Sequence, residues 1–172
     1  MFDVKRLIYL HGSESDSKSG KARQFREWFP GMLTPDFKGP FEERMSQLHS
    51  ILSDKTNWTL IGSSLGGLMG VTFAQDHPTQ VRKLILLAPA LTLDPFASRS
   101  DPSTLPSVAG QRLQPVSVPT IVVHGTLDTV VPLEPVREII QMVFTDVRYY
   151  IVNDDHRLHK TLHELDWKLL FE

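Results

Sequence analysis

A five-residue turn between an expected strand and an expected helix constrains this chain more than any other stretch. Gly62-Ser63-Ser64-Leu65-Gly66 fits the pattern Gly-x-Ser-x-Gly, with Ser64 at its centre. Apolar residues precede the turn as in a buried strand, and apolar residues at helical spacing follow it. Such a turn would hold the Ser64 hydroxyl exposed at the start of a helix, where the first backbone N–H groups have no partner. The same five residues would also suit a glycine-rich turn with a helix-capping serine.

Short apolar runs alternate with helical patterns along the rest of the chain. The expected strands are residues 7–10, 32–35, 57–61, 83–88, 119–123 and 147–152, and the expected helices are 22–29, 41–52, 65–77, 136–143 and 158–169. This alternation predicts an α/β fold with a doubly wound, mostly parallel sheet of about six strands and helices on both faces. A length of 172 residues predicts a single domain over residues 1–172.

Residues 89–115 interrupt the alternation with an irregular, proline- and serine-rich insert. Long irregular connections in compact domains are often lids or binding loops, so this insert is a candidate small lid. Residues 104–113 within it are expected to form a short helix.

Composition excludes several classes of function. The chain has no cysteine, which excludes disulfides, thiolate metal sites and a cysteine nucleophile. With a formal net charge of -2, the chain lacks the excess of basic residues that is typical of nucleic-acid-binding proteins. It also has no polybasic patch for a membrane surface. The lack of cysteine fits a reducing cytoplasm, so a cytoplasmic location is expected. No apolar run suits a signal peptide or a bilayer span.

Polar residues whose side chains could take part in catalysis follow several of the expected strands. Ligands bind beside the carboxyl ends of strands in open parallel sheets, and Ser64, Asp128 and His156 all come after such ends. A serine nucleophile requires a base that takes its proton and a carboxylate that orients the base. A serine, an aspartate and a histidine in this order could supply all three groups.

On these residues the chain resembles the α/β-hydrolase superfamily, in particular its small serine esterases without a cap domain. The resemblance covers nearly the whole chain. It rests on Leu10-His11-Gly12, Gly62-Ser63-Ser64-Leu65-Gly66, the stretch from Val123-His124-Gly125 through Asp128 to Val131-Pro132, and Asp155-His156-Arg157. In that family the catalytic residues follow the chain order serine, acid, histidine.

The resemblance implies a role for each candidate residue. Ser64 would be the nucleophile, His156 the general base and acid, and Asp128 the orienting carboxylate. The backbone N–H groups of Ser13 and Leu65 would form the oxyanion hole. No cofactor or metal would be needed, and the partner would be a small-molecule ester. The first strand here aligns with the third of the family, so the leading antiparallel strands would be missing.

Other residues compete for these roles. Ser63 is a rival nucleophile, although a supporting role behind the turn is favoured. Asp154 and Asp155 compete with Asp128 as the carboxylate, but their adjacency to His156 makes contact with its far ring nitrogen awkward. Asp36 is a weaker candidate.

The remaining histidines have less specific interpretations. His11 and His124 each precede a glycine at a strand end, where loop backbone is expected to satisfy them in preference to substrate. His156, His159 and His163 have helical spacing that could suggest a metal site, but no acidic or cysteine ligand completes it. The dinucleotide pattern Gly-x-Gly-x-x-Gly is absent.

The sequence therefore predicts a serine hydrolase acting on small or short-chain carboxylic esters. A thioesterase or peptidase with the same three residues is one alternative. A non-catalytic interaction protein that keeps the fold is the other. The sequence indicates no oligomeric state.

Overall fold

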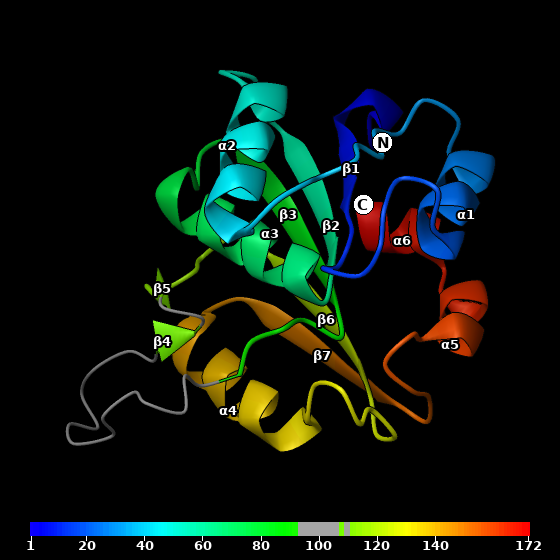
Figure 1. Cartoon of the computed structure of the whole chain (residues 1–172), viewed down its shortest axis with the longest axis vertical. Coiled ribbons are helices and arrows are strands. Elements are labelled where there is room, and N and C mark those ends of the chain that lie inside the picture. The colour runs from blue at the N-terminus through cyan, green and yellow to red at the C-terminus, as the bar shows by residue number, and fades with distance from the viewer. Residues whose placement is uncertain (93–106, 109–110) are drawn as a thin grey trace.

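A five-stranded parallel sheet forms the centre of the computed structural model, which describes residues 1–92, 107–108 and 111–172 (Figure 1). Its strands are β1 (Leu7–Leu10), β2 (Trp58–Ser63), β3 (Val81–Leu87), β6 (Thr120–Gly125) and β7 (Val147–Val152), in the order β1-β2-β3-β6-β7. All neighbouring pairs are parallel. The predicted α/β class with a doubly wound parallel sheet is confirmed.

Helices cover both faces of this sheet (Figure 1). The helices α2 (Phe41–Leu52), α3 (Leu65–Asp76) and α4 (Leu133–Val143) contribute to one apolar cluster, and α1 (Gly20–Trp28), α5 (His159–Glu164) and α6 (Trp167–Phe171) contribute to the other. A 3-10 turn, η1 (Val4–Arg6), precedes β1. Every residue of β1, β2 and β6 is buried, as expected for parallel strands covered on both faces.

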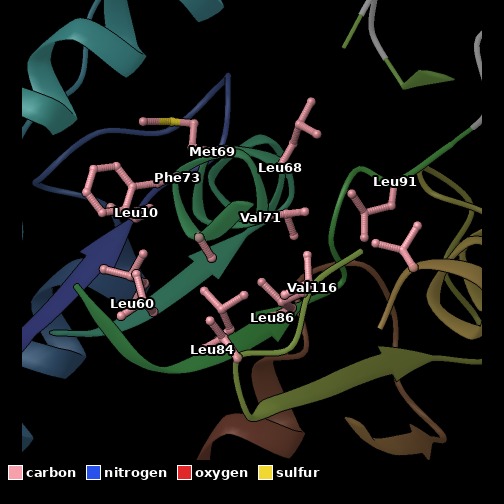
Figure 2. Close-up of a cluster of buried hydrophobic side chains, with 14 of the residues drawn as sticks. Leu10, Leu60, Leu68, Met69, Val71, Phe73, Leu84, Leu86, Leu91 and Val116 are labelled. Carbon is pink, nitrogen blue, oxygen red and sulfur yellow. The ribbon is translucent and has the colours of Figure 1, made fainter. Parts of the chain in front are cut away.

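Helix α3 packs against the sheet and contributes to the larger core cluster. Figure 2 shows side chains of α3 packed over Leu10 of β1, Leu60 of β2, and Leu84 and Leu86 of β3. This helix follows directly from β2, so the packing fixes the position of the turn between them.

The sixth expected strand, residues 32–35, is reduced to one bridge beside β1. The Tyr9 N–H donates to the Leu33 carbonyl at 2.9 Å, and the Leu33 N–H donates to the Leu7 carbonyl at 3.0 Å. The next N–H in this parallel ladder would come from residue 35. Residue 35 is proline and has no N–H, so the ladder stops after one residue.

The C-terminal helix expected over residues 158–169 is instead two short helices, α5 and α6. Leu165 has an extended backbone with ψ 135°, which ends α5. The Asp166 carboxylate accepts the Leu169 N–H at 3.1 Å and caps a new helix. Leu169 in this second helix is largely exposed.

The insert at 89–115 differs from expectation where it is described. β4 (Ser107–Val108) and β5 (Gln111–Arg112) pair as a short antiparallel ladder, in place of a helix over 104–113. Residues 93–106 and 109–110 lie outside the described residues, and the lid remains a prediction. No helix in the described ranges is long and apolar enough to cross a membrane.

Candidate active site

Ser64 occupies a strained turn between β2 and α3. Its backbone has φ 54° and ψ -117°, a region that residues other than glycine rarely adopt. The Ser64 N–H donates to the Leu87 carbonyl at 3.1 Å, and its own carbonyl accepts the N–H of Ala90 at 2.9 Å. These bonds tie the turn to β3 and the segment after it, so the surrounding structure maintains the strain.

Two glycines of the turn are required by close backbone approach. A Cβ atom at Gly66 would overlap the Leu10 carbonyl at the end of β1, and one at Gly62 would overlap the Gly66 carbonyl. Helix α3 therefore starts directly against the strand ends. The Gly-x-Ser-x-Gly spacing allows that contact.

The His156 ring contacts the Asp128 carboxylate, with Nδ1 2.8 Å from Oδ2. Asp128 follows β6 and His156 follows β7, and these strands are neighbours with Gly125 paired to Val152. The Asp128 side chain is fully buried, whereas that of His156 is 21% exposed. The buried carboxylate therefore holds a ring whose other edge is accessible.

Three further contacts fix the Asp128 carboxylate. Its Oδ1 atom accepts the N–H groups of Val130 at 2.9 Å and Val131 at 2.8 Å. Its Oδ2 atom lies 3.3 Å from Nε2 of His124, a fully buried side chain. That Nε2 atom also lies 2.9 Å from the Val131 carbonyl, which requires it to carry the proton. Both carboxylate oxygens are thus satisfied in one orientation.

Ser64 and His156 line the same cavity, which has a volume of about 800 Å³. Its wall also includes Gly12, Ser13, Lys21 and Asp155, among other residues. Within the described part of the chain Ser64 and His156 form no direct hydrogen bond. Such bonds often tighten only when substrate is bound.

The two candidate oxyanion N–H groups lie close to Ser64 and bond to no backbone carbonyl of the described residues. Leu65 is the first residue of α3, so no carbonyl of the helix can accept its N–H. The Ser13 N–H makes no hydrogen bond within the described ranges. A Cβ atom placed on neighbouring Gly12 would lie 3.4 Å from the Ser64 Cβ. Both donors are available to a charge that develops at Ser64.

The competing serine and carboxylates have other partners. Ser63 is buried, and its side chain hydrogen-bonds Tyr9. Burial raises the pKa of Tyr9, and this hydrogen bond partly offsets that rise. Asp154 accepts the Thr161 N–H and hydroxyl at 2.9 and 2.8 Å. Burial would raise the pKa of Asp154, but these bonds, the Asp155 N–H and the charge of Lys160 together lower the pKa. Asp155 accepts the Arg157 N–H at 2.9 Å.

Asp36 lies near His11. Its Oδ1 atom is 3.7 Å from the His11 Nε2 atom, and it accepts the Ser17 N–H at 3.3 Å. Of the four aspartates considered from the sequence, Asp128 is the one that contacts the His156 ring.

Loop backbone bonds to the rings of His11 and His124, as expected from the sequence. His11 is fully buried, and both of its ring nitrogens bond to backbone groups, Nδ1 to the Gly12 carbonyl and Nε2 to the Phe37 N–H. His124 is likewise buried, but its contact with Asp128 was not predicted. His156 lies before α5, so it does not share a helical face with His159 and His163 as its spacing suggested.

Lys21 is a cavity residue that sequence reasoning missed. Burial lowers its pKa to about 8, although nearby Asp155 acts in the opposite direction. Its ammonium forms no hydrogen bond or ion pair with the described residues. No sequence signal separates this lysine from the surface lysines, because its burial depends on how α1 docks.

Comparison with known families identifies one region of similarity. A family model for the α/β-hydrolase fold matches residues 38–112, which is less than half of the chain. In a comparison with curated protein sequences, none matched.

Solved structures resemble nearly the whole chain. Alpha/beta hydrolase domain-containing protein 10 from mouse is 22% identical, with a TM-score of 0.70 over 95% of this chain and 90% of that one. Paleococcus ferrophilus monoacylglycerol lipase is 16% identical, with a TM-score of 0.69 over 96% and 93%. Est1E from Butyrivibrio proteoclasticus, with ferulic acid bound, is 17% identical, with a TM-score of 0.71 over 95% and 86%.

These likenesses establish the architecture. The chain has the α/β-hydrolase fold, which the family model matches over residues 38–112 and the solved structures share over nearly the whole chain.

Proposed function

We propose that this α/β-hydrolase-fold protein is a serine hydrolase that cleaves small or short-chain carboxylic esters. One observation carries the proposal. His156 contacts the buried carboxylate of Asp128 at 2.8 Å, and its ring lines the same cavity as Ser64 at the strained turn. A nucleophile, a base and an orienting acid are the groups that acyl transfer through serine requires.

The first half of the proposed reaction forms an acyl-enzyme. With the Nδ1 proton held by Asp128, the Nε2 atom of His156 is free to accept the Ser64 proton. The Ser64 oxygen then bonds to the ester carbonyl carbon, and the carbonyl oxygen becomes an oxyanion. The N–H groups of Ser13 and Leu65 stabilise this charge. The bond to the alcohol oxygen breaks, and the alcohol leaves with the proton from His156.

The second half restores the free serine. His156 takes a proton from water, and the hydroxide oxygen bonds to the acyl carbon. The second tetrahedral intermediate collapses, the bond to Ser64 breaks, and Ser64 regains its proton from His156. The products are a carboxylic acid and free enzyme, and Asp128 stabilises the imidazolium in both halves.

The cavity and the structural neighbours support the proposed substrate class. The cavity of about 800 Å³ has a wall that includes serines and charged side chains, which suits small polar esters. One of the similar structures is named a monoacylglycerol lipase, and another, Est1E, has ferulic acid, a carboxylic acid, bound. Both are compatible with an ester substrate. The lid at 89–115 is not required for this proposal.

Labelling with a fluorophosphonate probe tests the proposed nucleophile. We expect the wild-type protein and Ser63→Ala to be labelled and Ser64→Ala to remain unlabelled. Labelling that survives Ser64→Ala and disappears in Ser63→Ala would overturn the assignment. If the wild-type protein is not labelled, the non-catalytic alternative is favoured.

A substrate panel tests the bond and the chain length. Nitrophenyl esters of increasing acyl length should be cleaved best when the acyl chain is short. Preference for long chains with activation at a lipid interface would contradict the proposal, and higher activity on matched thioesters or amides would favour the thioesterase or peptidase alternative.

A further inference from the structure

We propose that Arg44 is a positioning residue that orients the oxyanion-hole peptide of Ser13. This inference rests on the proposed function, because it concerns how one of the two oxyanion donors is held. Arg44 lies on α2, and its role was not evident from the sequence.

The guanidinium of Arg44 bonds to three backbone carbonyls. Its Nε atom donates to Gly39 at 2.9 Å, Nη1 to Gly12 at 3.2 Å and Nη2 to Ser13 at 3.3 Å. The residue is only 7% exposed. One planar group therefore holds two successive peptide units of the segment after β1.

The direction of these carbonyls determines where the Ser13 N–H points. The Gly12 carbonyl and the Ser13 N–H belong to one peptide group, and in a trans peptide they point in opposite directions. With the carbonyl directed at Arg44, the N–H lies on the other side of the peptide. It has no partner in the described ranges, and Gly12 and Ser13 line the cavity together with Ser64.

His11 braces the same carbonyl from a second direction. The Phe37 N–H donates to Nε2 of His11 at 2.9 Å, so this nitrogen has a lone pair and the ring proton is on Nδ1. Nδ1 then donates to the Gly12 carbonyl at 2.8 Å. Two donors, one of them a permanent cation, prevent this peptide from rotating.

Arginine suits this task better than lysine would. A guanidinium presents several N–H donors in a fixed plane and stays charged, so it can bind two carbonyls at once. Charge-assisted hydrogen bonds are also stronger than neutral ones. A lysine ammonium at the same place would act as a point charge and would leave the direction of at least one carbonyl less fixed.

The competing view is that Arg44 only fastens two loops together. It would then contribute to stability, and its loss would affect every property of the fold equally. The positioning role predicts more than this. Loss of Arg44 should impair the reacting state specifically, because an oxyanion donor acts on charge that develops during reaction.

Arg44→Met tests the inference, with Met45→Ala as the matched control. Met45 is a buried neighbour on the same helix, and its thioether has no N–H with which to bond the Gly12 or Ser13 carbonyls. For Arg44→Met we expect kcat on nitrophenyl butyrate to fall by ~10- to 1000-fold, with little change in KM. The upper limit of this range is the effect of removing one oxyanion donor completely. The rate of fluorophosphonate labelling should fall in parallel. Met45→Ala should lower stability to urea and leave kcat near the wild-type value.

Chemical rescue separates positioning from general destabilisation. Arg44→Ala should regain part of its kcat when methylguanidine is added, and Met45→Ala should show no such gain. If Arg44→Met does not fold, Arg44→Lys serves instead, with a smaller fall in kcat expected.

The outcomes distinguish this inference from the proposed function. Failure of the wild-type protein to label would refute the serine mechanism, and with it this role for Arg44. Normal labelling and normal kcat in folded Arg44 variants, with a reactive wild type, would refute the positioning role alone. Equal kcat losses in Arg44→Met and Met45→Ala at equal stability would also refute it.

Discussion

Nδ1 of His156 and Oδ2 of Asp128 lie 2.8 Å apart, joining the segments that follow two neighbouring strands. The carboxylate is fully buried, and its second oxygen is occupied by the N–H groups of Val130 and Val131. Asp128 therefore cannot turn away from His156 without losing backbone bonds. This rigidity makes the pair sensitive to a change of one atom.

Asp128→Asn should abolish most activity while preserving the fold. The amide oxygen would keep the Val130 and Val131 N–H groups, which directs the amide NH₂ at Nδ1 of His156. The ring would then carry its proton on Nε2 and could not accept one from Ser64. We expect kcat to fall by ~10⁴-fold, the size seen when a catalytic aspartate is replaced in this way. Steady-state kinetics on nitrophenyl butyrate measures it, with Asp155→Asn as the control. An equal loss in Asp155→Asn would contradict the assignment.

The elements that were predicted from the sequence depend on local patterns. Alternating apolar runs and helical spacing are properties of short stretches, so four of the helices and all five strands of the sheet lie close to where they were expected. The exceptions have local causes as well. Pro35 ends the bridge beside β1 because it lacks an N–H, and Asp166 starts a new helix by capping Leu169.

The candidate site was less predictable because it depends on long-range contacts. Asp128, Asp154 and Asp155 all precede His156 in the chain, and only the adjacency of β6 and β7 brings Asp128 to the His156 ring. Arg44 contacts a carbonyl 32 residues away, and nothing in an amphipathic helix indicates such a partner. Periodicity tells which face of a helix is buried, not which carbonyls lie beneath it.

Gly66→Ala should destabilise the protein strongly. The added methyl group would overlap the Leu10 carbonyl, and backbone atoms cannot move aside as the end of a flexible side chain can. We expect a loss of ~1–3 kcal/mol or more in the free energy of unfolding, the usual cost of overpacking. Gly20→Ala is the matched control, because its methyl group would meet nothing within 4 Å. Urea denaturation measures both, and equal stability of the two variants would refute the steric argument.

His124→Phe should lower stability by removing a buried donor. A phenyl ring is planar like imidazole, although larger, and has no N–H, so the Val131 carbonyl loses the hydrogen bond from Nε2 at 2.9 Å. A buried carbonyl without a partner costs ~1–3 kcal/mol, so the free energy of unfolding should fall by that amount. His159→Phe changes an exposed ring and should have little effect. A His124→Phe variant as stable as wild type would show that the carbonyl finds another partner.

Lys21→Met should stabilise the protein near neutral pH, and the gain should shrink in alkali. Burial lowers the pKa of Lys21 from 10.5 to about 8 in the folded state, so keeping it charged there costs free energy at pH 7. As the pH rises from about 8 to 10.5, the folded protein releases this proton before the unfolded chain does. The stability of the wild type should therefore rise relative to Lys21→Met in that window.

Urea denaturation of both proteins at pH 7 and at pH 10 measures the change in this difference. Arg23→Met is the control, because it removes an exposed cation from the same helix that does not titrate in this range. Its effect on the free energy of unfolding should be similar at both pH values. If the difference in free energy of unfolding between wild type and Lys21→Met is also the same at both pH values, the Lys21 ammonium is hydrated in the folded protein. In that case Lys21 would be an ordinary surface cation at the rim of the cavity.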